Sequence, residues 1–159
     1  MTQKLLNGLS QAEADEVLAL GERITVPSGG SLFQLGDVAD RLFVIERGLI
    51  RLSFPMMVHG QDKDIVFDEK APGETVGWSA MVPPYRFTLS ATAPLDTELI
   101  AFPREALTAF CERAPEIGRR INLNLAVLVG QRLQLVQAMW MREMQRAVEL
   151  RSNRAVVAS

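Results

Sequence analysis

The sequence predicts a mainly β protein with flanking helices, in which the strands form an antiparallel roll or barrel. Short apolar stretches separated by glycine turns follow one another between residues 23 and 102. A helix-forming segment precedes them, and helical periodicity fills the last third of the chain. A length of 159 residues and a hydrophobic content of 48% suit a domain with its own core. We therefore expect a single domain over residues 1–150 and a frayed tail over 151–159.

The first helix is expected over residues 10–20. Ser10 and Glu13 have the spacing of a capping box, in which each side chain accepts a hydrogen bond from the other residue's backbone N–H. Gly21 follows the last residues of the apolar face and ends the helix.

The β region, residues 23–102, is expected to contain short strands. The stretches at 24–26, 50–54 and 87–93 alternate apolar and polar residues, whereas the stretch at 42–45 is apolar throughout, as in a buried strand. Glycine turns, such as those at Gly36 and Gly48, separate them. The expected strands lie at 24–26, 31–35, 41–46, 49–54, 64–67, 87–93 and 98–102.

Two helices are expected over residues 103–150, the first beginning at Pro103 and the longer second one at Pro115. The longer helix carries a heptad-like apolar stripe that is interrupted at Arg132. A helix of about 30 residues is about 45 Å long, which exceeds what a small roll can cover. We therefore expect the stripe to form a dimer interface, although packing wholly on its own roll is the alternative. The expected interface residues are Ile121, Leu125, Leu128, Leu135 and Met139.

Charge and composition restrict the possible partners. The net charge is −2, but residues 1–103 carry 8 Lys/Arg against 14 Asp/Glu, and residues 104–159 carry 9 against 5. The basic excess is typical of a solvated helix face and does not predict specific nucleic-acid binding. The sequence has no secretory signal and no apolar run long enough to cross a membrane. Together with a single cysteine, this predicts a cytoplasmic protein without a membrane partner.

The chain lacks the residues of the common catalytic and metal sites. His59 and Cys111 are the only histidine and cysteine, so a cluster of His/Cys ligands cannot form. A Ser-His-Asp mechanism would need His59, which lies at an expected hairpin tip. No Walker-type loop or Rossmann glycine motif is present. We therefore expect no enzyme activity, no catalytic residue, no metal and no obligatory cofactor.

Residues 72–88 contain the most informative pattern. Gly77 opens a short helical turn, and Arg86 enters the next strand. Backbone N–H groups at such a turn bind anions, and an arginine can contact the same anion from the other side. The segment therefore predicts a site for a phosphate or carboxylate group.

The order of these motifs resembles the cyclic nucleotide-binding domain family, in particular the sensor domains of catabolite activator and fumarate–nitrate regulators. The resemblance covers about residues 5–148 and implies an eight-stranded antiparallel jelly-roll with an N-terminal helix. It also implies that the long C-terminal helix mediates dimerisation and that the protein is a regulatory or sensor domain. The motifs are PSGG at 27–30, LGD at 35–37, LFVIERG at 42–48, PGETVG at 72–77 and Arg86.

The resemblance also implies a phosphate-binding cassette. Arg86 matches the arginine that pairs with the cyclic phosphate, and the turn after Gly77 supplies backbone N–H groups. In the family, a glutamate follows the glycine and binds the ribose 2′-hydroxyl, but this chain has Trp78, which has no acceptor. The expected ligand-binding residues are Gly77, Trp78, Ser79, Ala80, Tyr85, Arg86 and Thr88.

The cassette departs from the family pattern in its spacing as well. Arg86 follows Trp78 by eight residues, about one fewer than usual, and Phe87 replaces a small residue. A buried ribose hydroxyl without a partner costs about 1–3 kcal/mol, so ordinary cyclic nucleotide binding is disfavoured. Glu74 is the nearest carboxylate that could replace the missing acceptor. Arg86 itself could instead form a surface ion pair.

Three interpretations of Trp78 remain open. In the first, its ring fills the space of the ribose and the site binds no ligand. In the second, Trp78 and Tyr85 form an aromatic wall for another ligand, whose acid group contacts Arg86. In the third, a cyclic nucleotide binds in an altered pose.

The resulting expectation is a stand-alone regulatory or sensor domain that forms homodimers and binds a small anionic ligand or cyclic nucleotide. The alternative is an adaptor that binds a protein partner through the roll or the long helix. The sequence ends about eleven residues beyond Val148, which is too few for the helix-turn-helix domain of related regulators. A cupin-type enzyme shares the jelly-roll but normally needs several histidines.

Overall fold

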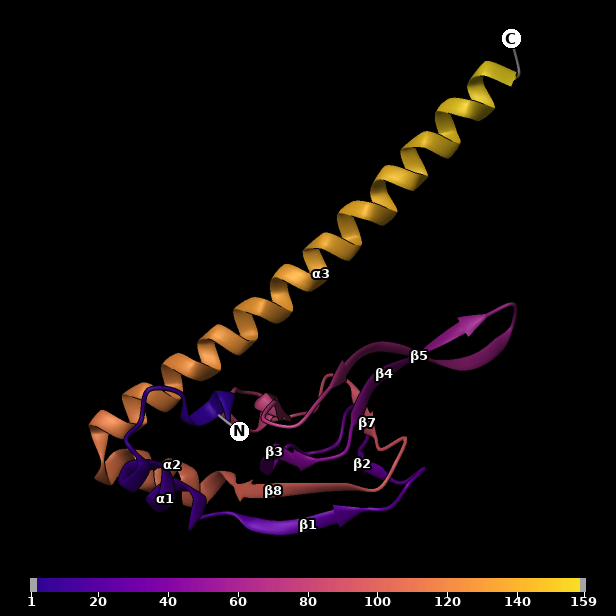
Figure 1. Ribbon diagram of the computed structural model, residues 1–159. Coiled ribbons are helices and arrows are strands. Elements are labelled where there is room, and N and C mark those ends of the chain that lie inside the picture. Colours follow the sequence, from indigo (N-terminus) through magenta and orange to yellow (C-terminus); the bar gives the residue numbers. More distant parts are fainter. Residues whose placement is uncertain (1–2, 158–159) are drawn as a thin grey trace. The chain divides into compact units, whose positions relative to one another are not determined.

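The computed structural model describes residues 3–157 (Figure 1). The chain divides into two compact units, Met1–Asn124 and Leu125–Ser159. The single domain expected over residues 1–150 stays a prediction.

The first unit begins with a short 3-10 helix, η1 (Lys4–Leu6), and helix α1 (Gln11–Leu18). The predicted capping box is present. The hydroxyl of Ser10 accepts a hydrogen bond from the Glu13 N–H at 3.3 Å, and the Glu13 carboxylate accepts one from the Ser10 N–H at 2.7 Å. The bond from the Ser10 backbone is the main cause of a lowered pKa of Glu13.

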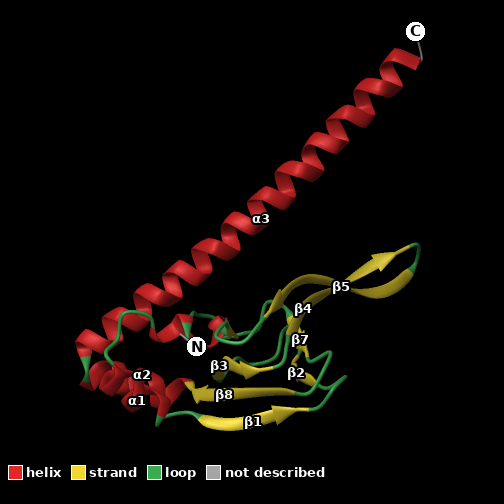
Figure 2. Ribbon diagram, in the orientation of Figure 1, coloured by secondary structure: helices red, strands yellow, loops and turns green. Residues whose placement is uncertain are grey.

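Eight antiparallel strands form two sheets, which confirms the predicted fold class (Figure 2). The strand orders are β1-β8-β3-β6 and β2-β7-β4-β5. The strands are β1 (Glu22–Val26), β2 (Ser31–Phe33), β3 (Arg41–Arg47), β4 (Ile50–Val58), β5 (Gln61–Lys70), β6 (Thr75–Val76), β7 (Ser90–Thr92) and β8 (Thr97–Pro103).

The two central strands of the first sheet, β3 and β8, supply much of the core. Leu42, Val44, Leu99 and Phe102 are fully buried. Successive side chains of a strand point to opposite faces. Because four consecutive residues of β3, 42–45, are all buried, both faces of this strand are covered, as the apolar run predicted.

The strand expected at 87–93 begins only at Ser90. The preceding residues pair elsewhere: Arg86 forms an isolated antiparallel bridge with Val38, and the Phe87 N–H donates to the Asp37 carbonyl at 3.0 Å. The Gly36 N–H in turn donates to the Phe87 carbonyl at 2.8 Å. This long-range pairing places the arginine segment beside residues 36–38.

The hairpin of β4 and β5 is longer than expected (Figure 1). Its tip is formed by His59 and Gly60, whose φ angles are 51° and 77°. His59 is exposed there, as predicted for a residue at a turn.

Helix α2 (Arg104–Arg113) follows β8, and Pro103 is the last strand residue rather than the first helical one. Leu107 and Phe110 form its buried face. Helix α3 (Pro115–Val157) then begins in the first unit and makes up the described part of the second. It includes residues of the expected tail up to Val157. Among the described residues, no helix is both long and apolar enough to cross a membrane.

Candidate functional site

The expected anion-binding turn is a 3-10 helix, η2 (Trp78–Met81), preceded by Gly77 with a φ of 78°. A Cβ atom at Gly77 would lie 3.1 Å from the Phe43 ring and 3.3 Å from the Phe87 ring. Both the left-handed backbone and the close packing therefore require glycine at this position. Ser79 and Ala80 are buried, and Trp78 is half-buried.

Phe87 is buried beside this turn, with 5% of its surface exposed. Its ring stacks on Phe33 with a centroid distance of 3.7 Å and an interplanar angle of 7°. Phe33 in turn lies 5.9 Å from Phe43. Three aromatic rings thus form an apolar cluster next to Gly77.

Arg86, the residue before Phe87, is exposed. Its Nη1 donates a hydrogen bond to the Gly36 carbonyl oxygen at 2.9 Å. This acceptor is a main-chain carbonyl, not the carboxylate of a surface ion pair, so the bond does not neutralise the guanidinium charge. Because neighbouring residues of an extended segment face opposite ways, burial of Phe87 accounts for the outward position of Arg86.

The short spacing noted in the sequence explains this arrangement. The family arginine follows its glutamate by about nine residues, and here the ninth residue after Trp78 is Phe87. A shift of one residue in an extended segment moves each side chain to the other face. Phe87 therefore occupies the inward position that the resemblance assigned to Arg86.

Tyr85 has a left-handed backbone with a φ of 56°, a conformation that costs a non-glycine residue about 1–3 kcal/mol. Two hydrogen bonds hold it: its N–H donates to the Val82 carbonyl at 3.0 Å, and its carbonyl accepts from the Ala39 N–H at 2.8 Å. The ring lies 4.3 Å from the guanidinium carbon of Arg104. Thr88, the last predicted ligand residue, is exposed.

Arg104 was not among the residues predicted for the site. It is the first residue of α2, and its backbone N–H donates to the Asp40 carbonyl at 2.8 Å. Its Nη1 donates to the Ala39 carbonyl at 3.1 Å. These bonds and the Tyr85 ring fix the guanidinium at the edge of a pocket.

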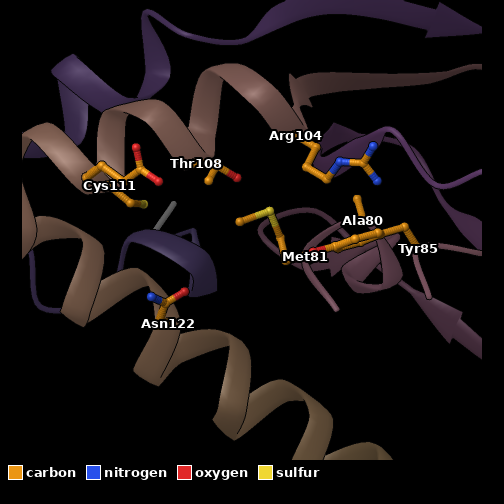
Figure 3. Close-up of a pocket in the computed structure, with 8 residues that line it drawn as sticks. Ala80, Met81, Tyr85, Arg104, Thr108, Cys111 and Asn122 are labelled. Atoms are coloured by element: carbon orange, nitrogen blue, oxygen red, sulfur yellow. The ribbon is translucent and has the colours of Figure 1, made fainter. Parts of the chain in front are cut away.

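This pocket, called the α2 pocket below, has a volume of about 350 Å³ (Figure 3). Helix α2 supplies four lining residues with helical spacing, η2 supplies two, and α3 supplies one. Burial raises the pKa of the Cys111 thiol in its wall. Of the predicted ligand residues, Ala80 and Tyr85 line it. The lining residues are Ala80, Met81, Tyr85, Arg104, Thr108, Cys111, Glu112 and Asn122.

Glu74, the proposed substitute for the missing glutamate, has other partners. Its carboxylate accepts hydrogen bonds from Lys4 Nζ at 2.7 Å and from the Ala71 N–H at 2.9 Å. Burial raises the pKa of Glu74, but the Ala71 amide, Lys4 and Lys70 together outweigh this effect and lower it. Glu74 therefore ties η1 to the turn before β6.

The residues expected at the dimer interface differ in exposure. Ile121 is fully buried and belongs to the core of the first unit, which corrects its assignment to an intermolecular interface. Leu125 is also buried, and Leu128 is half-buried. Leu135 and Met139 are 38% and 40% exposed. Only the later part of the predicted stripe thus presents exposed apolar side chains.

The described residues contain no group of three or more His, Cys, Asp or Glu side chains that could hold a metal ion.

Comparison with known proteins defines the class. The family described as "Cyclic nucleotide-binding domain" matches residues 23–114. This range runs from the second residue of β1 to the residue after α2 and contains Gly77 and η2. The chain therefore belongs to the cyclic nucleotide-binding domain family.

The relatives include a "Cyclic AMP receptor protein" from Thermus thermophilus, 33% identical over 129 residues, which cover 81% of this chain and 56% of the relative. The "Pycsar effector protein XpPycTIR" from Xanthomonas perforans is 29% identical over 139 residues, covering 87% of this chain and 43% of the relative. The chain thus spans about half the length of these two relatives.

Among solved structures, the Thermus thermophilus catabolite activator protein superposes with a TM-score of 0.72 at 30% identity, covering 86% of this chain and 61% of that one. The c-di-GMP responsive regulator CLP from Xanthomonas campestris gives a TM-score of 0.74 at 19% identity, covering 84% and 64%. The second likeness concerns the fold alone.

Proposed function

We propose that this chain is a regulatory domain, not an enzyme, in which the turn formed by Gly77 and η2 responds to a small ligand. Membership of the cyclic nucleotide-binding domain family supports the regulatory role. The similarity to a protein named cyclic AMP receptor protein supports ligand sensing.

We propose further that the chain does not bind cyclic AMP in the way its resemblance to the family would imply. One observation carries this proposal: Phe87 is buried against Phe33, whereas Arg86 is exposed and bonded to the Gly36 carbonyl. A phenyl ring cannot pair with a cyclic phosphate, and Trp78 cannot accept a bond from a ribose hydroxyl. The arginine and glutamate contacts that the resemblance implies for a cyclic nucleotide are thereby weakened.

The test introduces the glutamate and the arginine of the family cassette at position 78 and at position 87, where the structure places the inward-facing side chain. A triple variant, Trp78→Glu with Arg86→Leu and Phe87→Arg, places a carboxylate and a guanidinium nine residues apart. We expect cyclic AMP to raise the melting temperature of the triple variant but not that of the wild type. Ligand at a hundred times its dissociation constant adds about 2.7 kcal/mol of stability. Calorimetric titration measures the same binding directly.

The single variant Trp78→Glu is the matched control. It restores the acceptor but leaves Phe87 in the inward position, so we expect no gain of cyclic AMP binding. Stabilisation of the wild type by cyclic AMP would overturn the proposal. If Trp78→Glu alone bound cyclic AMP as well as the triple variant does, Trp78 would be the sole cause of the lost binding and Phe87 would play no part in it.

We also propose that α3 mediates homodimerisation. The exposed apolar side chains of Leu135 and Met139 support this role, because an exposed apolar stripe on a helix favours association. We expect sedimentation velocity to show a dimer for the wild type and a monomer for Leu135→Glu. A monomeric wild type would instead favour the adaptor alternative, in which the same side chains contact a different protein.

A further inference from the structure

The α2 pocket carries opposite charges at its two ends. Arg104 and Glu112 both line it and both belong to α2, eight residues apart. Eight residues of an α-helix rise about 12 Å. Figure 3 shows Arg104 and Tyr85 at one end of the pocket and Cys111, the neighbour of Glu112, at the other. The pocket therefore has a cationic end and an anionic end.

The cationic end is held in place before any ligand arrives. The Arg104 guanidinium lies over the Tyr85 ring, and its Nη1 is bonded to the Ala39 carbonyl. A guanidinium has five N–H donors, so this bond leaves capacity for a carboxylate. Tyr85 keeps its position despite a left-handed backbone, because two backbone hydrogen bonds fix it.

The other lining residues suit a ligand with both polar and apolar atoms. Thr108 and Asn122 offer a hydroxyl and an amide, which can bond the N–H and C=O groups of a peptide. Ala80 and Met81 of η2 add apolar contact. A volume of about 350 Å³ lies within the range of small-molecule sites.

From this arrangement we propose that the α2 pocket binds a short linear peptide with free termini, its carboxylate at Arg104 and its ammonium group at Glu112. An extended chain spans about 3.3–3.6 Å per residue, so three residues span about 10 Å. This length is comparable with the rise of about 12 Å along α2 between positions 104 and 112. The pocket is distinct from the aromatic cluster of Phe33, Phe43 and Phe87, so the proposal does not depend on the binding of a cyclic nucleotide.

The test uses trialanine as the probe and N-acetyl-trialanine amide, which lacks both terminal charges, as its control. Cys111 is the only cysteine of the chain and lies in the pocket wall, so its alkylation by iodoacetamide reports on occupancy. We expect saturating trialanine at neutral pH to slow alkylation about fivefold or more, since a bound ligand shields the lining residues. The capped peptide should have no effect. Calorimetry of the same two peptides gives the affinities.

Two variants test the two ends. Glu112→Gln and Arg104→Lys should each weaken trialanine binding by about tenfold or more, the loss expected for one charge-assisted contact. Glu112 is exposed, so its variant should keep the wild-type unfolding midpoint. Glu105→Gln is the matched control, because Glu105 lies on the same helix, is exposed and does not line the pocket. Absence of saturable trialanine binding, equal protection by the capped peptide, or unchanged affinity in both variants would overturn the proposal.

Discussion

The two ends of the segment from Gly77 to Met81 have contrasting surroundings. At its start, the atoms nearest to a Cβ on Gly77 belong to the rings of Phe43 and Phe87 and to the Arg41 backbone carbonyl, and none of these groups is charged. At its end, Ala80 and Met81 line a pocket that contains charged and polar side chains. Phe87, beside this apolar start, stands nine residues after Trp78, which is the spacing that the resemblance gives to the phosphate-binding arginine. The charged side chains of Arg104 and Glu112 line the pocket at the end of the segment, whereas the neighbours of Gly77 at its start are aromatic rings and a carbonyl.

The difference has an energetic consequence. A buried guanidinium without an anion costs several kcal/mol, so an inward arginine makes the fold depend on its ligand. A buried phenyl ring instead contributes about 1.5–3 kcal/mol by itself. With Phe87 inside and Arg86 outside, the roll can therefore be stable without a ligand in this position.

The largest expected effect is that of Phe87→Ala. Removing this ring leaves a cavity beside Phe33 and should lower the free energy of unfolding by about 3–5 kcal/mol. Urea denaturation measures the change. A loss of less than about 1 kcal/mol would show that Phe87 is not a core residue and would remove the contrast between the two ends.

A smaller loss is expected for Gly77→Ala. The new methyl group meets the strain of a positive φ and the close contacts to Phe43 and Phe87, which together cost about 2–3 kcal/mol. Gly36→Ala is the matched control: its φ is 90°, but nothing lies within 4 Å of the added atom. For Gly36→Ala we expect the free energy of unfolding to fall by about half as much as for Gly77→Ala. Equal losses would mean that backbone strain alone requires glycine at 77.

Much of the fold could be predicted from the sequence because its signals are local. The alternating strands, the doubly buried run at 42–45 and the capping box of Ser10 and Glu13 were all predicted correctly. The start of β7 was not, because Arg86 and Phe87 pair with residues 36–38, which are about fifty positions away in the chain. Such long-range pairing leaves no trace in local periodicity.

The site was predicted less completely, for two physical reasons. The spacing of eight residues between Trp78 and Arg86, about one fewer than in the family, indicated a shift by one residue. The sequence did not show that this shift turns Phe87 inward and Arg86 outward, because that depends on the burial of Phe87 in the folded protein. The α2 pocket was missed. The spacing of Arg104, Thr108 and Glu112 is visible in the sequence, yet such residues usually form a solvated helix face. Only tertiary packing brings η2 and Asn122 to that face.

Glu74→Gln tests whether the strand before the turn is anchored independently of any ligand. The folded protein lowers the pKa of Glu74 below 4.5, so the carboxylate stabilises the fold above that pH and the contribution is lost as the pH falls through the folded pKa. We expect the variant to be about 1 kcal/mol less stable at neutral pH and equal to the wild type in acid. Urea denaturation across this pH range gives the difference. A constant difference would exclude the charge of Glu74 as its source.

The smallest effect is expected for Tyr85→Ala, because Tyr85 lines the α2 pocket beside the polar end of the segment. Tyr85 is 38% exposed, and its contact with Arg104 is worth about 0.5–1 kcal/mol at an exposed position. The two backbone hydrogen bonds that hold this residue do not need its ring. We therefore expect the free energy of unfolding to fall by less than about 1 kcal/mol. Urea denaturation of this variant and of Phe87→Ala under the same conditions compares the two losses. A loss as large as that of Phe87→Ala would mean that both ends of the segment belong to one core, so that the α2 pocket could not be altered without unfolding the roll.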